Sequence, residues 1–222
     1  MLTCENIGKV YATERGDVEA VKGISLEVPR GQFAAIVGRS GSGKSSLMAM
    51  IGGLSRPTRG TIRFGDTDIW SLSTDRLGQF RNCEIGFMFQ FPSLLPTLRI
   101  VDNVALPALL ARQQRADAAY RNAADLLDRM GLAGHIDAYP GELSSGEQRR
   151  AVIARSLINS PMLLLADEPT SDLDEETEGE IMDQLRAVNR DRRVTLIMVT
   201  HNLRLAEQAE RILHIADGRL VP

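Results

Sequence analysis

The sequence predicts an α/β fold built on a mainly parallel β-sheet, and three observations support this. Nearly continuous runs of Val, Ile, Leu and Met, at 33–37, 85–89, 162–166 and 194–199, are typical of strands buried on both faces. These runs alternate with segments in which apolar residues recur at helical spacing, which favours β-α-β connections. One of the strands also leads through a glycine-rich loop straight into a helix.

An antiparallel β unit is predicted ahead of the first buried strand. Residues 2–11 and 19–28 have the composition of strands, and a polar stretch separates them. A turn at 29–31 then leads into the strand 33–37. Tyr11 is placed at the end of the first strand, where its ring either stacks on a purine or packs against the protein. Position alone favours neither role.

Helices and strands alternate through the middle of the chain. A helix at 46–51, a strand at 61–64 and a short helix at 75–81 precede the strand 85–89. Between 91 and 138 the apolar residues recur at helical spacing, which predicts a mainly helical lobe.

The last part of the chain returns to alternating elements and ends in a small hairpin. The predicted elements are a helix at 146–159, a strand at 162–166, a charged helix at 175–190, a strand at 194–199, a short helix near 203–208 and a hairpin over 211–221.

Composition limits the classes of function. A chain of 222 residues with 43% hydrophobic content is long enough for one large domain. Its net charge of −3 gives no basic footprint for nucleic acid. Cys4 and Cys83 are too few for a disulfide framework or a zinc site, which fits a reducing cytosol. No apolar run approaches the roughly 18 residues that span a bilayer, and residues 1–10 lack the apolar block of a signal peptide.

Residues 38–45, Gly-Arg-Ser-Gly-Ser-Gly-Lys-Ser, have the spacing G-x-x-x-x-G-K-[ST] between a strand and a helix. Glycines let successive backbone N–H groups turn toward a phosphate chain, and the helix N-terminus favours an anion. Lys44 is expected to reach the β- and γ-phosphates, and the Ser45 hydroxyl to bind Mg²⁺. The alternative, a glycine-rich turn that binds nothing, does not explain Lys-Ser at this offset. The predicted phosphate site comprises Gly38, Arg39, Ser40, Gly41, Ser42, Gly43, Lys44, Ser45 and Ser46.

Polar residues end three of the predicted strands, at the sheet edge where open α/β folds bind ligands. Asp167 and Glu168 follow the strand 162–166. Asp167 can bind Mg²⁺, and Glu168 can polarise a water for attack on the γ-phosphate. His201 follows a neighbouring strand and can contact the γ-phosphate or hold Glu168 in line, with an exposed histidine as the alternative. Gln90 has an amide that can contact metal and water, with a surface glutamine as the competing interpretation.

A second candidate anion site lies at residues 143–148, Leu-Ser-Ser-Gly-Glu-Gln, which precede a helix. Ser144 is a natural N-cap, and the N–H groups beyond it suit a phosphate. One phosphate loop already binds the nucleotide, so this second site suggests a ligand from elsewhere. In a two-fold dimer, the Ser144 end of each chain would close over the nucleotide of the other.

In combination, these motifs resemble those of ABC-transporter ATP-binding subunits, over essentially the whole chain. The resemblance implies a P-loop NTPase fold of ABC ATPase type, with a mainly parallel core, an antiparallel β subdomain and a helical subdomain, and with ATP and Mg²⁺ as ligands. One domain, 1–222, would then consist of a core at 1–90 and 139–222 and a helical subdomain at 91–138. The matching segments are the loop 38–45, Gln90, 143–148, Leu-Leu-Leu-Ala-Asp-Glu-Pro-Thr at 163–170, Ser-Asp-Leu-Asp at 171–174, and His201.

The resemblance also implies a role for each matching residue. Adenine would stack on Tyr11, and Gln90 would bind Mg²⁺ and couple the two lobes. Glu168 would be the catalytic base and His201 the switch. The residues used across the dimer would be Ser144, Ser145, Gly146, Glu147 and Asp174.

The short cassette looks most like the subfamily of lipoprotein-release and macrolide-exporter ATPases, with two departures from the usual motifs. The signature usually reads L-S-G-G-Q, whereas here Ser145 replaces the first glycine and Glu147 the glutamine. Ser145 therefore puts a side chain where backbone should approach phosphate. The segment 171–174 replaces the commoner Gly-Asn-Leu-Asp but keeps Asp174.

We therefore expect an ATPase that powers a membrane transporter, acting as a peripheral subunit on the cytoplasmic face of the inner membrane. Its partners would be a second copy of itself and integral membrane permease subunits, contacted near residues 91–104, and no nucleic acid. One alternative is a cell-division-type regulatory ATPase that signals to a cell-wall hydrolase without transport. An ABC-type ATPase of DNA repair or translation would need a long coiled coil or a second cassette, and a small-molecule kinase would have no signature segment.

Overall fold

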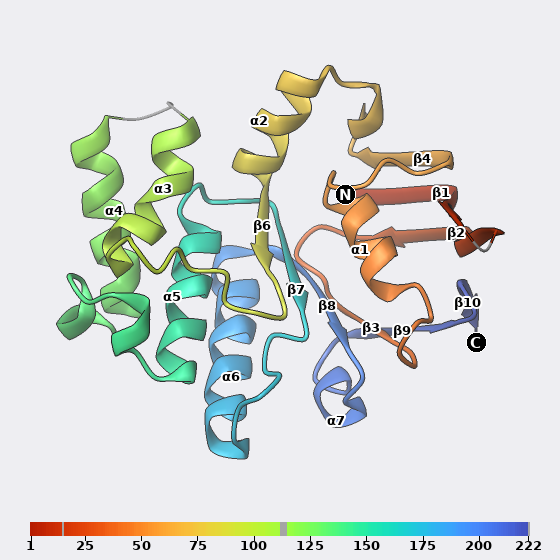
Figure 1. Cartoon of the computed structure of the whole chain (residues 1–222). Coiled ribbons are helices and arrows are strands. Elements are labelled where there is room, and N and C mark those ends of the chain that lie inside the picture. Colours follow the sequence, from red (N-terminus) through yellow and green to blue (C-terminus); the bar gives the residue numbers. More distant parts are fainter. Residues whose placement is uncertain (15, 112–114, 222) are drawn as a thin grey trace.

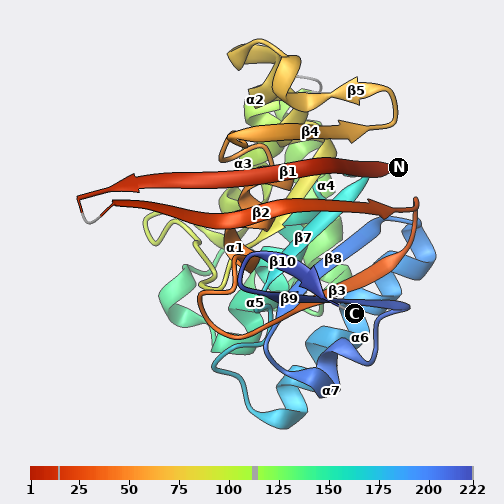
Figure 2. The same ribbon diagram turned by 90° about the vertical axis from the view of Figure 1, so that its right-hand side faces the viewer.

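The computed structural model describes residues 1–14, 16–111 and 115–221, and its strands form two sheets (Figures 1 and 2). The strands are β1 Leu2–Thr13, β2 Gly16–Val28, β3 Phe33–Val37, β4 Arg59–Phe64, β5 Thr67–Asp68, β6 Ile85–Met88, β7 Leu163–Asp167, β8 Thr195–Thr200, β9 Arg211–Ala216 and β10 Arg219–Val221. The α-helices are α1 Lys44–Ile51, α2 Thr74–Glu84, α3 Ile100–Ala111, α4 Ala116–Arg129, α5 Ser145–Leu157, α6 Glu175–Arg192 and α7 Leu203–Ala206. Short 3₁₀ turns lie at Ile69–Ser71, Ala133–His135 and Pro140–Glu142.

The larger sheet has the strand order β10-β9-β3-β8-β7-β6. All its pairings are parallel except the hairpin between β9 and β10, which confirms the predicted parallel core. Because parallel strands share a direction, the carboxyl ends of β3, β6, β7 and β8 meet at one edge of the sheet. The glycine-rich loop and the polar residues that follow these strands are thereby brought together.

The two faces of this sheet are covered differently. One face packs against the helices α3 to α6, and side chains such as Leu164 and Ala166 of β7 belong to that core. The alternate residues of the same strand, Leu163 and Leu165, pack with α1 and with the smaller sheet. Alternate side chains of the strand point to opposite faces of the sheet, and both faces are covered. Each strand therefore needs an almost continuous apolar run.

The smaller sheet is antiparallel, with the order β2-β1-β4-β5. It contains the two strands predicted at the start of the chain, and Leu2 pairs with Val28 across them. The predicted strand at 61–64, β4, joins this sheet by pairing with β1 through Leu2 and Phe64, and β5 pairs with β4 at the edge. The sequence indicated neither of these pairings. Figure 2 shows this sheet as a layer beside the core.

The segment predicted to be helical contains α3 and α4. The buried residues of α4 recur at the spacing of one helix face, at Ala119, Ala123, Leu126 and Leu127. This face packs against α3 and α5 in the core described above. Among the described residues of this region, 100–111 and 116–129 are α-helical, whereas 91–99 form no helix.

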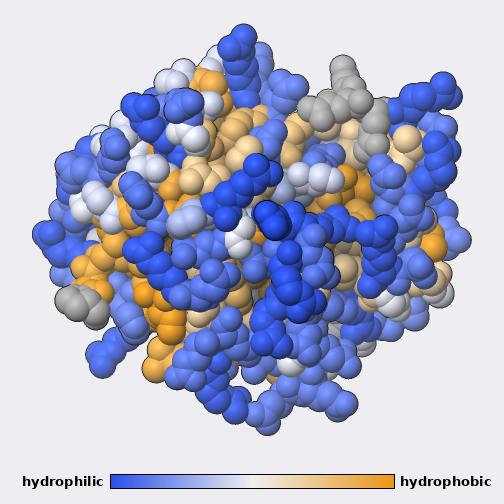
Figure 3. Space-filling model, turned by 180° about the vertical axis from the view of Figure 1, so that it is seen from behind, coloured by the Kyte–Doolittle hydropathy of each residue, from blue (hydrophilic) through white to orange (hydrophobic). Residues whose placement is uncertain are grey.

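Polar residues cover much of the surface. The face turned away from the viewer in Figure 1 has hydrophilic side chains across most of its centre (Figure 3). Among the described residues, none of the helices is both long enough and apolar enough to span a membrane. The two most exposed large apolar side chains, Phe91 and Leu110, lie instead on the segment after β6 and at the end of α3.

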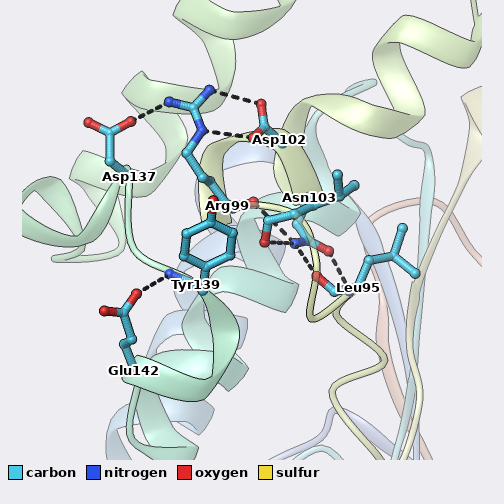
Figure 4. A network of polar contacts seen from close by, with 8 residues as sticks. Leu95, Arg99, Asp102, Asn103, Asp137, Tyr139 and Glu142 are labelled. Atoms are coloured by element: carbon cyan, nitrogen blue, oxygen red, sulfur yellow. Dashed lines mark hydrogen bonds and ion pairs between the residues drawn. The ribbon is translucent and has the colours of Figure 1, made fainter.

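A buried side chain orders the irregular segment between β6 and α3 (Figure 4). Asn103 is 1% exposed, and its Oδ1 accepts a hydrogen bond of 2.7 Å from the Leu95 N–H. Its Nδ2 donates to the carbonyls of Leu95, Leu98 and Arg99, each at 3.1 Å. Arg99 in turn forms ion pairs with Asp102 and Asp137. The backbone between Gln90 and α3 is therefore fixed by side chains of the helical segment.

Candidate nucleotide site

A pocket of about 580 Å³ lies at the carboxyl edge of the larger sheet. It brings together residues from four separate stretches of sequence that the motifs singled out. The residues that line it are Ala20, Ser40, Gly41, Ser42, Gly43, Lys44, Ser45, Ser46, Gln90, Asp167, Glu168 and His201.

The glycine-rich loop adopts a backbone that other residues would not tolerate. A Cβ at Gly38 would lie 2.3 Å from the Ile215 carbonyl oxygen, and one at Gly43 would lie 2.3 Å from that of Ala20. Gly41 has a left-handed backbone, with φ of 76°. The loop is thus shaped by its glycines into a concave backbone, of the kind that cradles an anion.

Lys44 begins α1 and its chain folds back across the loop. Its Nζ donates hydrogen bonds of 2.7 Å to the Gly38 carbonyl and 3.0 Å to the Arg39 carbonyl. The N-cap of α1 is Gly43, which has no side chain to bind the first N–H groups of the helix. The ammonium, these N–H groups and the helix dipole together favour a phosphate at this point.

The oxygen ligands expected for Mg²⁺ are close to one another. Burial raises the pKa of Asp167, and the Glu168 carboxylate raises it further, while the Lys44 ammonium and a hydrogen bond from Ser45 lower it. Mg²⁺ is usually held by one or two carboxylates together with substrate phosphates. The described residues contain no group of three or more His, Cys, Asp or Glu side chains that could hold a metal. Ser45, Asp167 and Gln90 line the same pocket as the phosphate loop, and their oxygen atoms fit a magnesium that is shared with a nucleotide.

Glu168 is held in a strained position by the neighbouring strand. Its φ is 46°, in the left-handed region, and its N–H donates to the Val199 carbonyl at 2.9 Å. Oε2 accepts a 3.2 Å hydrogen bond from the Thr200 hydroxyl, and Oε1 lies 2.8 Å from Nδ1 of His201. The carboxylate is thus oriented through both oxygens, as a base that must hold a water in line requires.

Tyr11 lies beside the phosphate loop. Its hydroxyl lies 3.4 Å from the Ser46 hydroxyl, and the Lys9 ammonium lies 5.1 Å from the centre of its ring. The sequence interpretation placed Tyr11 at a strand end, but β1 continues to Thr13 because Tyr11 still pairs with Val18. Its ring is partly exposed on that strand.

The signature segment lies apart from this pocket. Ser144 is the N-cap of α5, as predicted, and forms a reciprocal pair with Glu147. The Glu147 Oε2 accepts from the Ser144 N–H at 2.8 Å and from its hydroxyl at 2.7 Å. These hydrogen bonds lower the pKa of Glu147. The exposed Ser145 follows at the start of the helix.

Asp174 and Gly146 also have local structural roles. Asp174 caps α6, accepting from the Thr177 N–H at 3.0 Å and from its hydroxyl at 2.7 Å. A Cβ on Gly146 would lie 2.6 Å from a methyl of Thr177. None of residues 144–147 and 174 is among the described residues that line the pocket. One chain therefore does not bring its own signature to its own phosphate loop.

Three residues near these motifs were not singled out by their sequence pattern. Thr200 holds the Glu168 carboxylate, and its position before His201 is the one signal that could have found it. His135, which the sequence gave no role, lies 3.8 Å from Glu147. Arg149 is buried beneath the segment that contains Gln90.

A glycine-rich loop between a buried strand and a helix, with carboxylates at the end of a nearby parallel strand, defines a P-loop nucleotide-binding protein. A family model described as ABC transporter matches residues 21–171. The chain belongs to this family, and it is an ATP-binding subunit of the ABC-transporter type.

Named relatives place the chain more finely within the family. It is 47% identical over 221 residues to the lipoprotein-releasing system ATP-binding protein LolD of Geobacter metallireducens, covering 100% of this chain and 98% of that protein. It is 44% identical over 223 residues to the macrolide export ATP-binding/permease protein MacB of Syntrophobacter fumaroxidans, covering 100% of this chain but 31% of that protein. The resemblance to the lipoprotein-release and macrolide-exporter subfamily is thereby confirmed.

Solved structures give the same result for the fold. The ATP-binding cassette MJ0796, solved as a dimer in a post-hydrolysis state bound to ADP and Pi, matches with a TM-score of 0.92 and 34% identity. The match covers 100% of this chain and 97% of that one. The ABC ATPase fold predicted from the sequence is therefore confirmed.

Proposed function

We propose that this chain hydrolyses Mg²⁺-bound ATP and uses the reaction to drive a membrane transporter of the lipoprotein-release or macrolide-export type. The observation that supports this most directly is the shared pocket of Lys44, Asp167, Glu168 and His201. A site that only binds a nucleotide needs no more than the phosphate loop. An oriented carboxylate at its far side is the additional group that hydrolysis requires.

Each residue has a distinct part in the proposed reaction. Lys44 and the first N–H groups of α1 bind the β- and γ-phosphates. Ser45, Asp167 and Gln90 would hold Mg²⁺, which when bound would neutralise charge on the phosphates. Glu168 accepts a proton from the attacking water.

His201 and Tyr11 act at the two ends of the substrate. The imidazole of His201, 2.8 Å from Glu168, keeps the carboxylate in line and contacts the γ-phosphate. Tyr11 stacks on the adenine ring at the other end of the site. Its hydroxyl lies 3.4 Å from Ser46, in the helix that follows the phosphate loop.

Two copies of the chain close head to tail in the proposed cycle. Residues 144–147 would face the γ-phosphate bound by the partner, and Asp174 would contact the partner beside it. The N-terminus of α5 supports this, because Ser144 and Ser145 are exposed there and the helix dipole favours an anion. Hydrolysis then removes the γ-phosphate that joins the two copies, and the dimer reopens.

A groove beside the segment after β6 supports the proposal of a permease partner. It has a volume of about 1080 Å³ and lies between α2, α3 and α5. Its apolar lining includes Leu54, Phe87, Phe89, Leu106 and Leu110. An apolar segment of a membrane subunit, on the cytoplasmic side of the membrane, would pack in this groove and against residues 91–104. This contact would hold the chain at the inner membrane and carry motion from Gln90 to the transporter.

The test uses Glu168→Gln with saturating ATP and Mg²⁺. We expect unchanged ATP binding, a fall in kcat of about 10²- to 10⁴-fold, and a stable dimer in size-exclusion chromatography. Wild-type turnover in this variant would remove Glu168 from its role. A variant that binds ATP but stays monomeric would contradict the head-to-tail arrangement.

The transport role needs a separate experiment, because a regulatory ATPase that signals to a cell-wall hydrolase would have the same site. The membrane protein that co-purifies with the chain is reconstituted in vesicles. ATP-dependent flux of substrate supports transport. A partner that binds a hydrolase and gives no flux supports signalling instead.

A further inference from the structure

The side chain of Arg149 joins three segments that are far apart in the sequence. It lies in α5 and is 3% exposed. Nη1 donates to the Phe89 carbonyl at 2.9 Å, and Nη2 donates to the Gln90 carbonyl. Nη2 also lies 3.1 Å from the Ser171 hydroxyl and 3.4 Å from the Ser171 carbonyl oxygen.

These contacts compensate for a buried charge. Burial lowers the pKa of the Arg149 guanidinium, and the Asp172 carboxylate partly offsets this. Within the described chain no carboxylate forms an ion pair with the guanidinium, and the groups that accept its hydrogen bonds are oxygens of three residues. A buried cation is costly unless it is hydrogen-bonded. Moving one of the three segments away would remove an acceptor from the guanidinium, so the segments are held together strongly.

The three segments lead to different parts of the proposed site. Phe89 and Gln90 connect β6 to the pocket, and Phe89 also lines the apolar groove. Ser171 begins the loop that ends at Asp174, the N-cap of α6. Arg149 itself lies less than two turns after Ser144 on α5.

We propose that Arg149 is a positioning residue that couples Gln90 of one nucleotide site to the α5 end and the 171–174 loop that face the other. The inference rests on the proposed function, because it assumes that Gln90 contacts the metal and that Ser144 faces the partner's γ-phosphate. Movement of the Gln90 backbone toward a bound nucleotide then carries α5 and Ser171 with it. In the opposite direction, movement of Phe89 in the groove changes the position of α5.

A second arginine of the same helix provides a matched control. Arg155 donates to the Ser93 carbonyl at 2.7 Å and to the Pro92 carbonyl at 3.1 Å. Burial lowers the pKa of its guanidinium as well. Arg155 therefore holds the same irregular segment as Arg149, but the two carbonyls that it binds belong to neither Gln90 nor Ser171.

The experiment compares Arg149→Met, Arg149→Lys and Arg155→Met. Methionine keeps an apolar stem of similar length but has no N–H donor. For Arg149→Met we expect unchanged ATP binding and KM, and a kcat lower by about ten- to a hundredfold, as for a lost hydrogen bond to a charged group. Lysine keeps the charge on a single nitrogen and should recover part of this loss. For Arg155→Met we expect kcat within about twofold of wild type.

Dimer formation in the Glu168→Gln background is the second readout. Arg149→Met should raise the ATP concentration needed for dimerisation about tenfold or more, and Arg155→Met should not. Equal effects of the two methionine variants, or unchanged kcat and dimerisation in Arg149→Met, would overturn the proposal. If Arg149→Met fails to fold, Arg149→Lys is compared with Arg155→Lys on the same two readouts.

A double-variant cycle with Gln90→Ala tests whether Arg149 acts through Gln90. Coupled residues give non-additive effects, so Arg149→Met should cost little more kcat once the Gln90 amide is absent. Additive losses would overturn the coupling. Failure of the proposed function is distinguishable, because the Glu168→Gln protein with wild-type Arg149 would then form no dimer.

Discussion

The Nδ1 atom of His201 lies 2.8 Å from Oε1 of Glu168, and the Thr200 hydroxyl holds the other oxygen of the same carboxylate. The side chain of His201 is 75% exposed, whereas that of Glu168 is 16% exposed. The histidine therefore lies between solvent and the carboxylate. Thr200 is buried and fixes Glu168 from within the sheet.

His201→Ala should therefore lower kcat more than it affects ATP binding. We expect a loss of about 10²-fold or more, because Glu168 loses one of its two contacts and the γ-phosphate loses a partner. Thr200→Val is the control, since it removes the other contact to Glu168 but none to the substrate, and it should cost less. Steady-state kinetics with separate kcat and KM values check this. Equal losses in the two variants would show that His201 only orients Glu168.

Lys44→Ala should weaken nucleotide binding itself. The Lys44 ammonium is held over the phosphate loop by the Gly38 and Arg39 carbonyls. We expect a rise in Kd for ATP of at least about tenfold, the effect of losing a charged hydrogen bond. Titration calorimetry measures it, with Glu168→Gln as the control whose Kd should not rise. Unchanged affinity would remove Lys44 from the phosphate contact.

Asn103→Asp should destabilise the protein although it exchanges one heavy atom. The Asn103 Nδ2 donates to three backbone carbonyls, and aspartate has no N–H to replace it. The buried carbonyls lose their donor and a charge enters a nearly inaccessible position. We expect a loss of at least about 1–3 kcal/mol in the free energy of unfolding, measured by urea denaturation. An exposed asparagine of β1, Asn6, gives the matched control variant Asn6→Asp, which should cost much less.

The sequence was informative for some parts of the molecule and silent about others, for physical reasons. Asp167, Glu168 and His201 could be assigned because they end or directly follow buried strands, and parallel strands bring such ends together. The pairing of β4 with β1 could not, because register depends on partners distant in sequence. Arg149 was missed because adjacent charged residues in a helix predict a solvated face. Its burial depends on carbonyls of Phe89 and other distant residues, which no local pattern reveals.

The ion pair beside Asn103 should make stability depend on pH (Figure 4). Hydrogen bonding to Arg99 lowers the pKa of Asp102 in the folded state. A carboxyl with a lowered folded pKa stabilises the protein above its unfolded pKa of about 3.9 and loses this effect as the pH falls through the folded value. The stability difference between wild type and Asp102→Asn should thus stay constant from neutral pH to about pH 5 and shrink below about pH 4. Urea denaturation across this range checks it, and a constant difference at all pH values would contradict the ion-pair explanation.

Ser145→Gly tests the departure from the usual signature. Ser145 is exposed at the first position of α5, whereas the adjacent Gly146 has no room for a Cβ beside Thr177. In the proposed dimer, a side chain at 145 would stand between the helix N–H groups and the partner's γ-phosphate. Glycine there should lower the ATP concentration that dimerises the Glu168→Gln protein.

Ser145→Gly should have the opposite effect on the stability of the isolated chain. The change in stability can therefore be measured separately from the change in dimerisation. Glycine in a helix costs up to about 1 kcal/mol of stability relative to alanine, so the free energy of unfolding should fall slightly while dimerisation becomes easier. Gly146→Ala is the control, because its methyl would meet Thr177 within 2.6 Å and should disturb the packing of α5 on α6. Unchanged dimerisation in Ser145→Gly would show that the serine hydroxymethyl group points away from the phosphate. Ser145 would then not weaken the proposed head-to-tail dimer.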